Sequence, residues 1–90
     1  MSSSYAYLTA TTLVKPMAGV YKGIFVSAAS STPTITVYDT SAASGAAPAI
    51  IGTFTPVAGT SYMLNENGVY ANHGIRVEIT GTVSCTVVFE

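Results

Sequence analysis

The sequence predicts an all-β fold, a small antiparallel β-sandwich of jelly-roll-like or Greek-key type with about seven to eight short strands and no substantial helix. No segment repeats apolar residues at helical spacing over the roughly 11 residues that a helix needs. β-Branched and aromatic runs are instead separated by breaks of small residues or proline. The runs recur about every 10–12 residues, as in sandwich folds. A chain of 90 residues has apolar surface for one core, so residues 1–90 are expected to form a single domain.

The expected strands follow from these runs in chain order. Residues 1–13 are interpreted as an N-terminal arm or as the first strand, and the first apolar run is either one strand or two pieces. Breaks are expected at Lys15-Pro16, within 27–33, within 40–48 and at later glycine, asparagine and proline positions. The strands are expected at residues 5–14, 20–27, 34–39, 49–54, 61–64, 74–80 and 84–89.

The alternation of apolar and charged residues along the strand at 74–80 predicts which of its faces is exposed to solvent. Ile75, Val77 and Ile79 share one face, while Arg76 and Glu78 project from the other. This pattern is typical of an antiparallel strand with one face buried and one in solvent. Arg76 and Glu78 are therefore expected on the solvent face.

Two further expectations concern the second strand and the C-terminus. In the second strand Ile24 and Val26 share a face, and Tyr21 and Phe25 lie on the opposite one. Near the C-terminus, Gly81 separates two β-rich runs, which predicts a strand, a tight glycine turn and a second strand.

The low charge of the chain limits its partners. Charged residues make up 8% of the sequence, against about 25% in ordinary soluble domains, and the net charge is −1. The three cationic side chains, Lys15, Lys22 and Arg76, are too few for phosphate binding, so no nucleic-acid partner is expected. A surface with so few charges is expected to be covered by copies of the chain, which makes a homo-oligomer, or by a larger scaffold.

The sequence shows no membrane-spanning segment, no signal peptide and a single cysteine. No apolar run approaches the roughly 20 residues that span a bilayer, so no membrane partner is expected. The beginning, MSSSYAYLTATTLVK, lacks the basic and apolar segments of a signal peptide, which predicts synthesis in the cytoplasm. The single Cys85 alternates with Val83 and Val87 and is expected to be a buried small apolar side chain.

The sequence offers no constellation for catalysis, so no enzyme, no catalytic residue, no cofactor and no metal site is predicted. The lone His73 lies between Asn72 and Gly74, a pattern typical of an exposed turn. Residues 65–68, Asn-Glu-Asn-Gly, faintly resemble a calcium loop, but the downstream acid is missing and Asn-Gly favours a turn. Asp39 ends a strand and is expected to accept hydrogen bonds from backbone groups two residues on.

The order of these features resembles that of small virion proteins of tailed bacteriophages. The resemblance covers roughly residues 14–90 and is carried by the run GVYKGIFVSAASSTPTITVYDTSAASGAAP, then SYMLNENGVY, GIRVEITGT and the terminal TVVFE. Its most recognisable positions are Gly19, Gly23, Asp39, Gly74 and Gly81. The resemblance implies an all-β subunit of the capsid decoration or cement kind, assembled as trimers on the head lattice, with no catalytic residues.

The expected function is therefore that of a structural virion protein on the capsid surface. It would bind the assembled lattice of the major capsid protein and stabilise it by bridging subunits, in the way that multivalent contacts support a small domain. The alternative is a carbohydrate-binding or adhesive β-module of a head fibre or tail, with the six tyrosines facing a glycan. The small-residue segment 41–48, SAASGAAP, is either a mobile loop or one ordered by a neighbouring surface.

Overall fold

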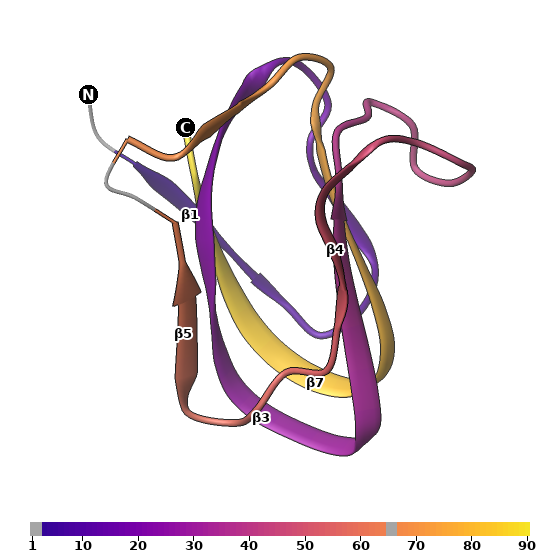
Figure 1. Cartoon of the computed structure of the whole chain (residues 1–90), viewed down its shortest axis with the longest axis vertical. Helices are drawn as coiled ribbons and strands as arrows, with labels where there is room; N and C mark the ends of the chain where they lie inside the picture. The colour runs from indigo at the N-terminus through magenta and orange to yellow at the C-terminus, as the bar shows by residue number, and fades with distance from the viewer. Residues whose placement is uncertain (1–2, 65–66) are drawn as a thin grey trace.

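The chain forms a single antiparallel β-sheet that curls on itself. The computed structural model describes residues 3–64 and 67–90, and all statements about the structure refer to these. The curled sheet is drawn in Figure 1. The all-β fold class is confirmed. The strands of the described part are β1 (Ser4–Leu8), β2 (Thr12–Lys15), β3 (Gly19–Tyr38), β4 (Ala49–Phe54), β5 (Thr60–Met63), β6 (Val69–Ala71) and β7 (Ile75–Phe89).

Two long strands form the centre of the sheet. β3 has 20 residues and β7 has 15, and they pair antiparallel from Tyr21 opposite Phe89 to Tyr38 opposite Arg76. Both strands bend near their middles, so that the two ends of the ribbon lie opposite each other (Figure 1). The pairing register shifts at this bend, between Ser30 and Thr34.

The bend corrects the prediction of a hairpin at Gly81. β7 runs through Gly81 without a turn, and β3 likewise runs through the expected break at 27–33. Gly81 has φ +80°, and a Cβ atom there would lie 2.8 Å from Pro33 Cα. Only glycine meets both conditions, because other residues disfavour positive φ and would clash with the opposite strand. The glycine therefore bends a continuous strand instead of ending one.

The bend divides the sheet into two arms. The first arm has the strand order β1-β7-β3-β5 and uses residues 85–89 of β7 and 23–26 of β3. The second arm has the order β2-β7-β3-β4 and uses the other ends of the same two strands. β6 pairs with β3 at residues 19–21, beyond the first arm.

Most expected strands exist, with altered boundaries. The run 5–14 is two strands, β1 and β2, which pair with opposite ends of β7. β4 covers the expected residues 49–54, and β5 begins one residue earlier than expected. The three-residue β6 was not predicted from the sequence, since its run between Gly68 and Asn72 is shorter than an ordinary strand signal.

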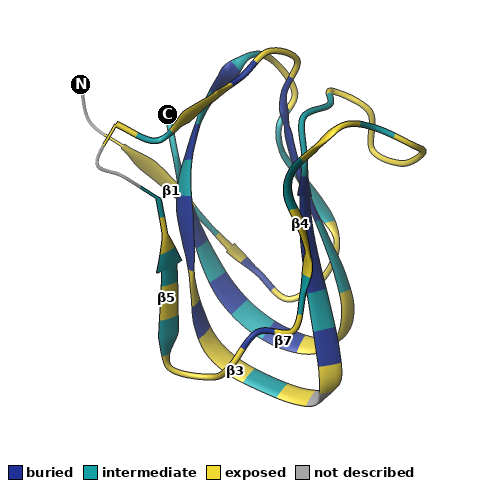
Figure 2. Cartoon of the chain, viewed as in Figure 1, coloured by how far each residue is buried: buried dark blue, intermediate teal, exposed yellow. Residues whose placement is uncertain are grey.

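The core lies between the two arms. Along residues 83–88 of β7, buried positions alternate with half-buried ones, whereas residues 35–37 of β3 and 75–77 of β7 are each buried in succession (Figure 2). Cys85 is fully buried, as predicted, and burial raises the pKa of its thiol to about 11. The core consists of Leu8, Tyr21, Ile24, Val26, Ile35, Val37, Ala71, Ile75, Val77, Val83, Cys85 and Val87.

Tyr21 was expected on the face opposite Ile24, and this prediction was wrong. The register of β3 against β7 shifts between Tyr21 and Gly23, which leaves one extra residue in β3. Such a bulge reverses the alternation, so Tyr21 and Ile24 both point into the core. Burial raises the pKa of the Tyr21 hydroxyl, and the nearby Cys85 raises it further.

Candidate functional site

The outward side of the first arm carries an uncharged surface, here called the outer face. Side chains of directly paired residues share a face of a sheet. One row of pairs crosses all four strands through Tyr7, Thr86, Phe25 and Ser61, and the next row does so through Tyr5, Val88, Gly23 and Met63. Neither row contains a charged residue.

The large side chains of the outer face are unusually exposed for their type. The exposed fractions are 73% for Tyr5, 59% for Tyr7, 40% for Phe25 and 49% for Met63. The row between them, which includes Ile24, and the row beyond Tyr7, which includes Leu8 and Val26, point into the core. Each exposed side chain therefore belongs to a strand whose opposite face packs in or against the core.

An ion pair lies at the end of the first arm. The Lys22 ammonium is 3.0 Å from the Glu90 carboxylate, and both side chains are less than a fifth exposed. The hydrogen bond from Lys22 lowers the pKa of Glu90 more than desolvation raises it. Because the two charges neutralise each other, they add no net charge at this border of the outer face.

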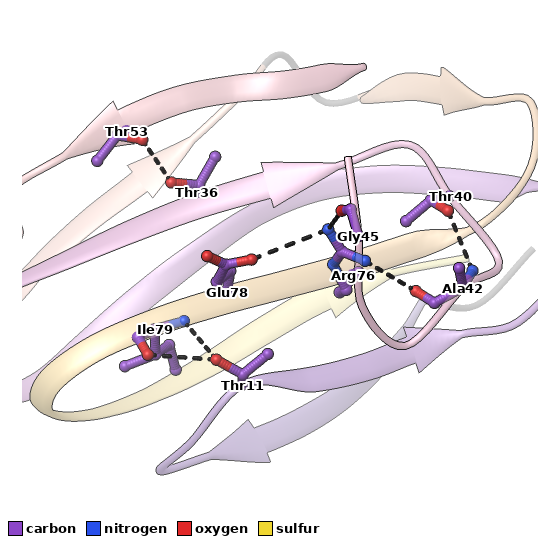
Figure 3. A network of polar contacts seen from close by, with 9 residues as sticks. All are labelled: Thr11, Thr36, Thr40, Ala42, Gly45, Thr53, Arg76, Glu78 and Ile79. Atoms are coloured by element: carbon purple, nitrogen blue, oxygen red, sulfur yellow. Dashed lines mark hydrogen bonds and ion pairs between the residues drawn. The ribbon is translucent and has the colours of Figure 1, made fainter. Parts of the chain in front are cut away.

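A buried guanidinium holds residues 41–47, here called the 41–47 segment, which follow β3. Arg76 is 1% exposed. Its Nη1 donates to the carbonyl of Ala42 at 3.2 Å, and its Nη2 donates to the carbonyl of Gly45 at 2.5 Å (Figure 3). The guanidinium carbon lies 4.6 Å from the centre of the Tyr38 ring, and Nη2 is 3.8 Å from the Glu78 carboxylate.

These contacts correct the prediction that Arg76 faces solvent. Arg76 does point away from the core face of β7, as alternation requires, but the 41–47 segment covers it. Exposed residues 41–46 are tied to the sheet by their own backbone carbonyls. The segment is thus ordered from within the chain, by the one residue type that offers a planar fork of donors.

Asp39 also makes different bonds from those expected. Its carboxylate accepts the backbone N–H groups of His73 at 2.8 Å and Asn72 at 3.2 Å, instead of those of the next residues along the chain. Desolvation raises the pKa of Asp39. The hydrogen bonds from the backbone of His73, Asn72 and Gly74 together lower this pKa by more than desolvation raises it, so the net shift is downward. Asp39 therefore caps the turn before β7.

An apolar pocket of about 370 Å³ lies between β4 and β5. Its lining comes from Tyr21, Ile51, Phe54, Tyr62, Met63 and Leu64, which carry no charge. Phe54 and Tyr62 touch across it with ring centres 4.8 Å apart. The Tyr62 hydroxyl accepts the backbone N–H of Val57 at 2.9 Å. Among the residues that the structure describes, the lining contains no carboxylate, imidazole, thiol or amine.

The remaining candidates from the sequence do not meet at one place. His73 is exposed on its turn, 3.6 Å from the Asp39 carboxylate. Residues 65 and 66 of the calcium-like motif lie outside the described residues. Within 3–64 and 67–90, no group of three or more His, Cys, Asp or Glu side chains could hold a metal ion.

No family model matches the chain, and no curated protein and no solved structure matches it either. In the described part of the chain, no helix is long and apolar enough to cross a membrane.

Proposed function

We propose that this chain is a structural virion protein of the tailed-bacteriophage kind, a capsid decoration or cement protein. It binds the assembled head through the outer face and stabilises the head by bridging capsid subunits. It acts as a homo-oligomer, with a trimer favoured. We further propose that the two arms are the sheets of a jelly-roll-like or Greek-key sandwich.

The observation that carries this proposal is the outer face itself. Four large apolar or aromatic side chains, Tyr5, Tyr7, Phe25 and Met63, are exposed together on paired strands. Contiguous exposed apolar surface marks a protein interaction site, and tyrosine and methionine are enriched in such interfaces. Because the strands are held by the core, docking costs little conformational entropy.

A glycan is the second candidate ligand, and the two exposed tyrosines of β1 favour it. Tyr5 and Tyr7 lie on the same side of the strand, about 7 Å apart along it, where sugar rings could stack. The two rows of the outer face contain no carboxylate or side-chain amide. Sugar recognition needs such groups for the hydroxyls, so a protein surface fits the outer face better.

Binding to phage heads tests the proposal. Heads of the source particle that lack this chain would be mixed with purified protein and sedimented. We expect stoichiometric co-sedimentation of the wild type, and at least tenfold weaker binding of Phe25→Lys, because docking would bury an unpaired ammonium.

Val57→Lys is the matched control. Val57 is exposed but belongs to none of the four strands of the first arm, so the variant should bind like the wild type. Equal binding of both variants, or absence of wild-type binding, would contradict the proposal. Binding to a glycan array without binding to heads would support the carbohydrate-binding alternative.

A further inference from the structure

The first arm has two open edges. Within residues 3–64 and 67–90, β1 pairs only with β7 and β5 pairs only with β3. One side of each strand therefore presents backbone N–H and C=O groups without a strand partner, a template for another strand. β5 also borders the apolar pocket, whose lining at this edge includes Tyr62 and Met63.

Neither of these edges carries the features that usually prevent strand addition. Protective features are lysine, proline and bulges. β1 reads SYAYL and β5 reads TSYM, and both pair with their neighbours without a register shift. The edges of the second arm differ, since β2 contains Lys15 and a register shift, and β4 pairs across two register shifts.

Strand direction makes the two open edges complementary. β1 is antiparallel to β7, β7 to β3, and β3 to β5. β1 and β5 consequently run in opposite directions. A second copy in the same orientation, placed with its β1 against β5, continues the antiparallel ladder and extends the outer face without interruption.

We propose that β5 of one copy accepts β1 of the next copy, so that each chain uses both edges in a head-to-tail contact. The occupant is a second copy because β1 is uncharged, opposes no charge on β5, and would cover the apolar pocket beside that strand. Head-to-tail contacts close into a ring where the rotation from copy to copy closes, as the favoured trimer requires, and form an open filament where it does not. The inference rests on the self-association in the proposed function and is independent of binding to heads.

Charges placed on the two edges test this contact in the isolated protein. Tyr7 and Ser61 lie at the two ends of one row of the outer face. The contact that pairs all four residues of β5 with β1 and keeps the outer faces on one side places Tyr7 of one copy beside Ser61 of the next. The Tyr7→Lys/Ser61→Lys variant places like charges across it, and the Tyr7→Glu/Ser61→Lys variant places opposite charges there. Both positions are exposed, so both variants should fold, which circular dichroism would check.

Light scattering over a range of concentrations provides the readout. We expect a wild-type oligomer, association about tenfold weaker for the Lys/Lys variant, and recovery for the Glu/Lys variant at low salt. Val57→Lys should associate like the wild type. Recovery also excludes a symmetric β1–β1 contact, which would bring together two glutamates and no lysine.

Three results would overturn the inference. These are a wild-type monomer at all concentrations, unchanged association of the Lys/Lys variant, and equally weak association of both double variants. Failure to bind heads by an oligomer that passes the charge test would instead contradict only the proposed function.

Discussion

Replacing Arg76 with methionine should release the segment at 41–47 while the sheet stays folded. Methionine fills much of the volume of the arginine side chain and packs against Tyr38, but it donates no hydrogen bond. The carbonyls of Ala42 and Gly45 lose the guanidinium as their hydrogen-bond donor and accept hydrogen bonds from water instead. Among the residues that the structure describes, no side-chain hydrogen bond then joins the 41–47 segment to β7.

The expected loss of stability is about 2 kcal/mol. A hydrogen bond to a charged group contributes about 1.5–3 kcal/mol, and Arg76 makes two of them to the segment. Stacking on the Tyr38 ring adds about 1 kcal/mol. Against this, methionine removes the desolvation cost of a buried cation and of the buried Arg76 Nε, which has no hydrogen-bond partner, together about 3–4 kcal/mol.

Thermal unfolding and proteolysis measure the two parts of this effect. A loss of about 2 kcal/mol lowers the Tm by about 8–16 °C in a domain of this size. Elastase, which cleaves after small residues, should cut the variant within 41–47 at a temperature where the wild type is resistant. Lys22→Met is the matched control, since it removes a cation from the partly exposed pair with Glu90 and leaves the segment in place.

Two outcomes would refute the role of Arg76. One is a Tm equal to or above that of the wild type together with unchanged resistance of the segment. The other is equal cleavage of Lys22→Met and Arg76→Met, which would show that loss of any cation loosens the segment.

Three other changes test the core, the turn cap and the bend. Ile35→Asp should abolish folding, because it buries an unpaired carboxylate at a fully buried site, whereas Ser44→Asp in the exposed segment should leave the Tm within a few degrees of the wild type; equal shifts would mean that core and loop are reversed. Because folding lowers the pKa of Asp39 below its ordinary value of 3.8, the carboxylate contributes stability above pH 3.8, and this contribution is lost as the pH falls through the pKa of the folded state. The free energy of unfolding should therefore fall less on acidification for Asp39→Asn than for the wild type. An identical acid dependence would contradict that role. Gly81→Ala should cost about 1–2 kcal/mol in denaturant unfolding from the positive φ alone, and more from the contact of the new Cβ with Pro33; no loss would argue against the bend.

Local pattern predicted the strands and the inward residues wherever alternation is regular. The run 49–54 and the inward set of Ile75 and Val77 are examples, because a strand alternates with period two regardless of its partner. The pattern failed for Tyr21, where a bulge reverses the alternation. It failed for Gly81 too, because positive φ serves a turn and a bent strand equally well, and only the pairing with β3 decides between them.

The outer face could be predicted from the sequence in its character but not in its position. Low charge predicted an uncharged surface, and Tyr5 and Tyr7 share one side of their strand in any β interpretation. That this side faces outward, on the same face of the sheet as Phe25, follows from the register of β1 and β3 on β7, which links residues about 60–85 positions apart. The hydrogen bonds between Arg76 and the 41–47 segment, which link residues 34 and 31 positions apart, are also non-local and have no signal in the sequence.

Electron microscopy of phage particles that contain this chain would test the central claim most directly. The proposed function predicts density for this chain on the head, with the outer face of Tyr5, Tyr7, Phe25 and Met63 against the capsid lattice. Density absent from the head, or present with the outer face turned to solvent, would contradict it.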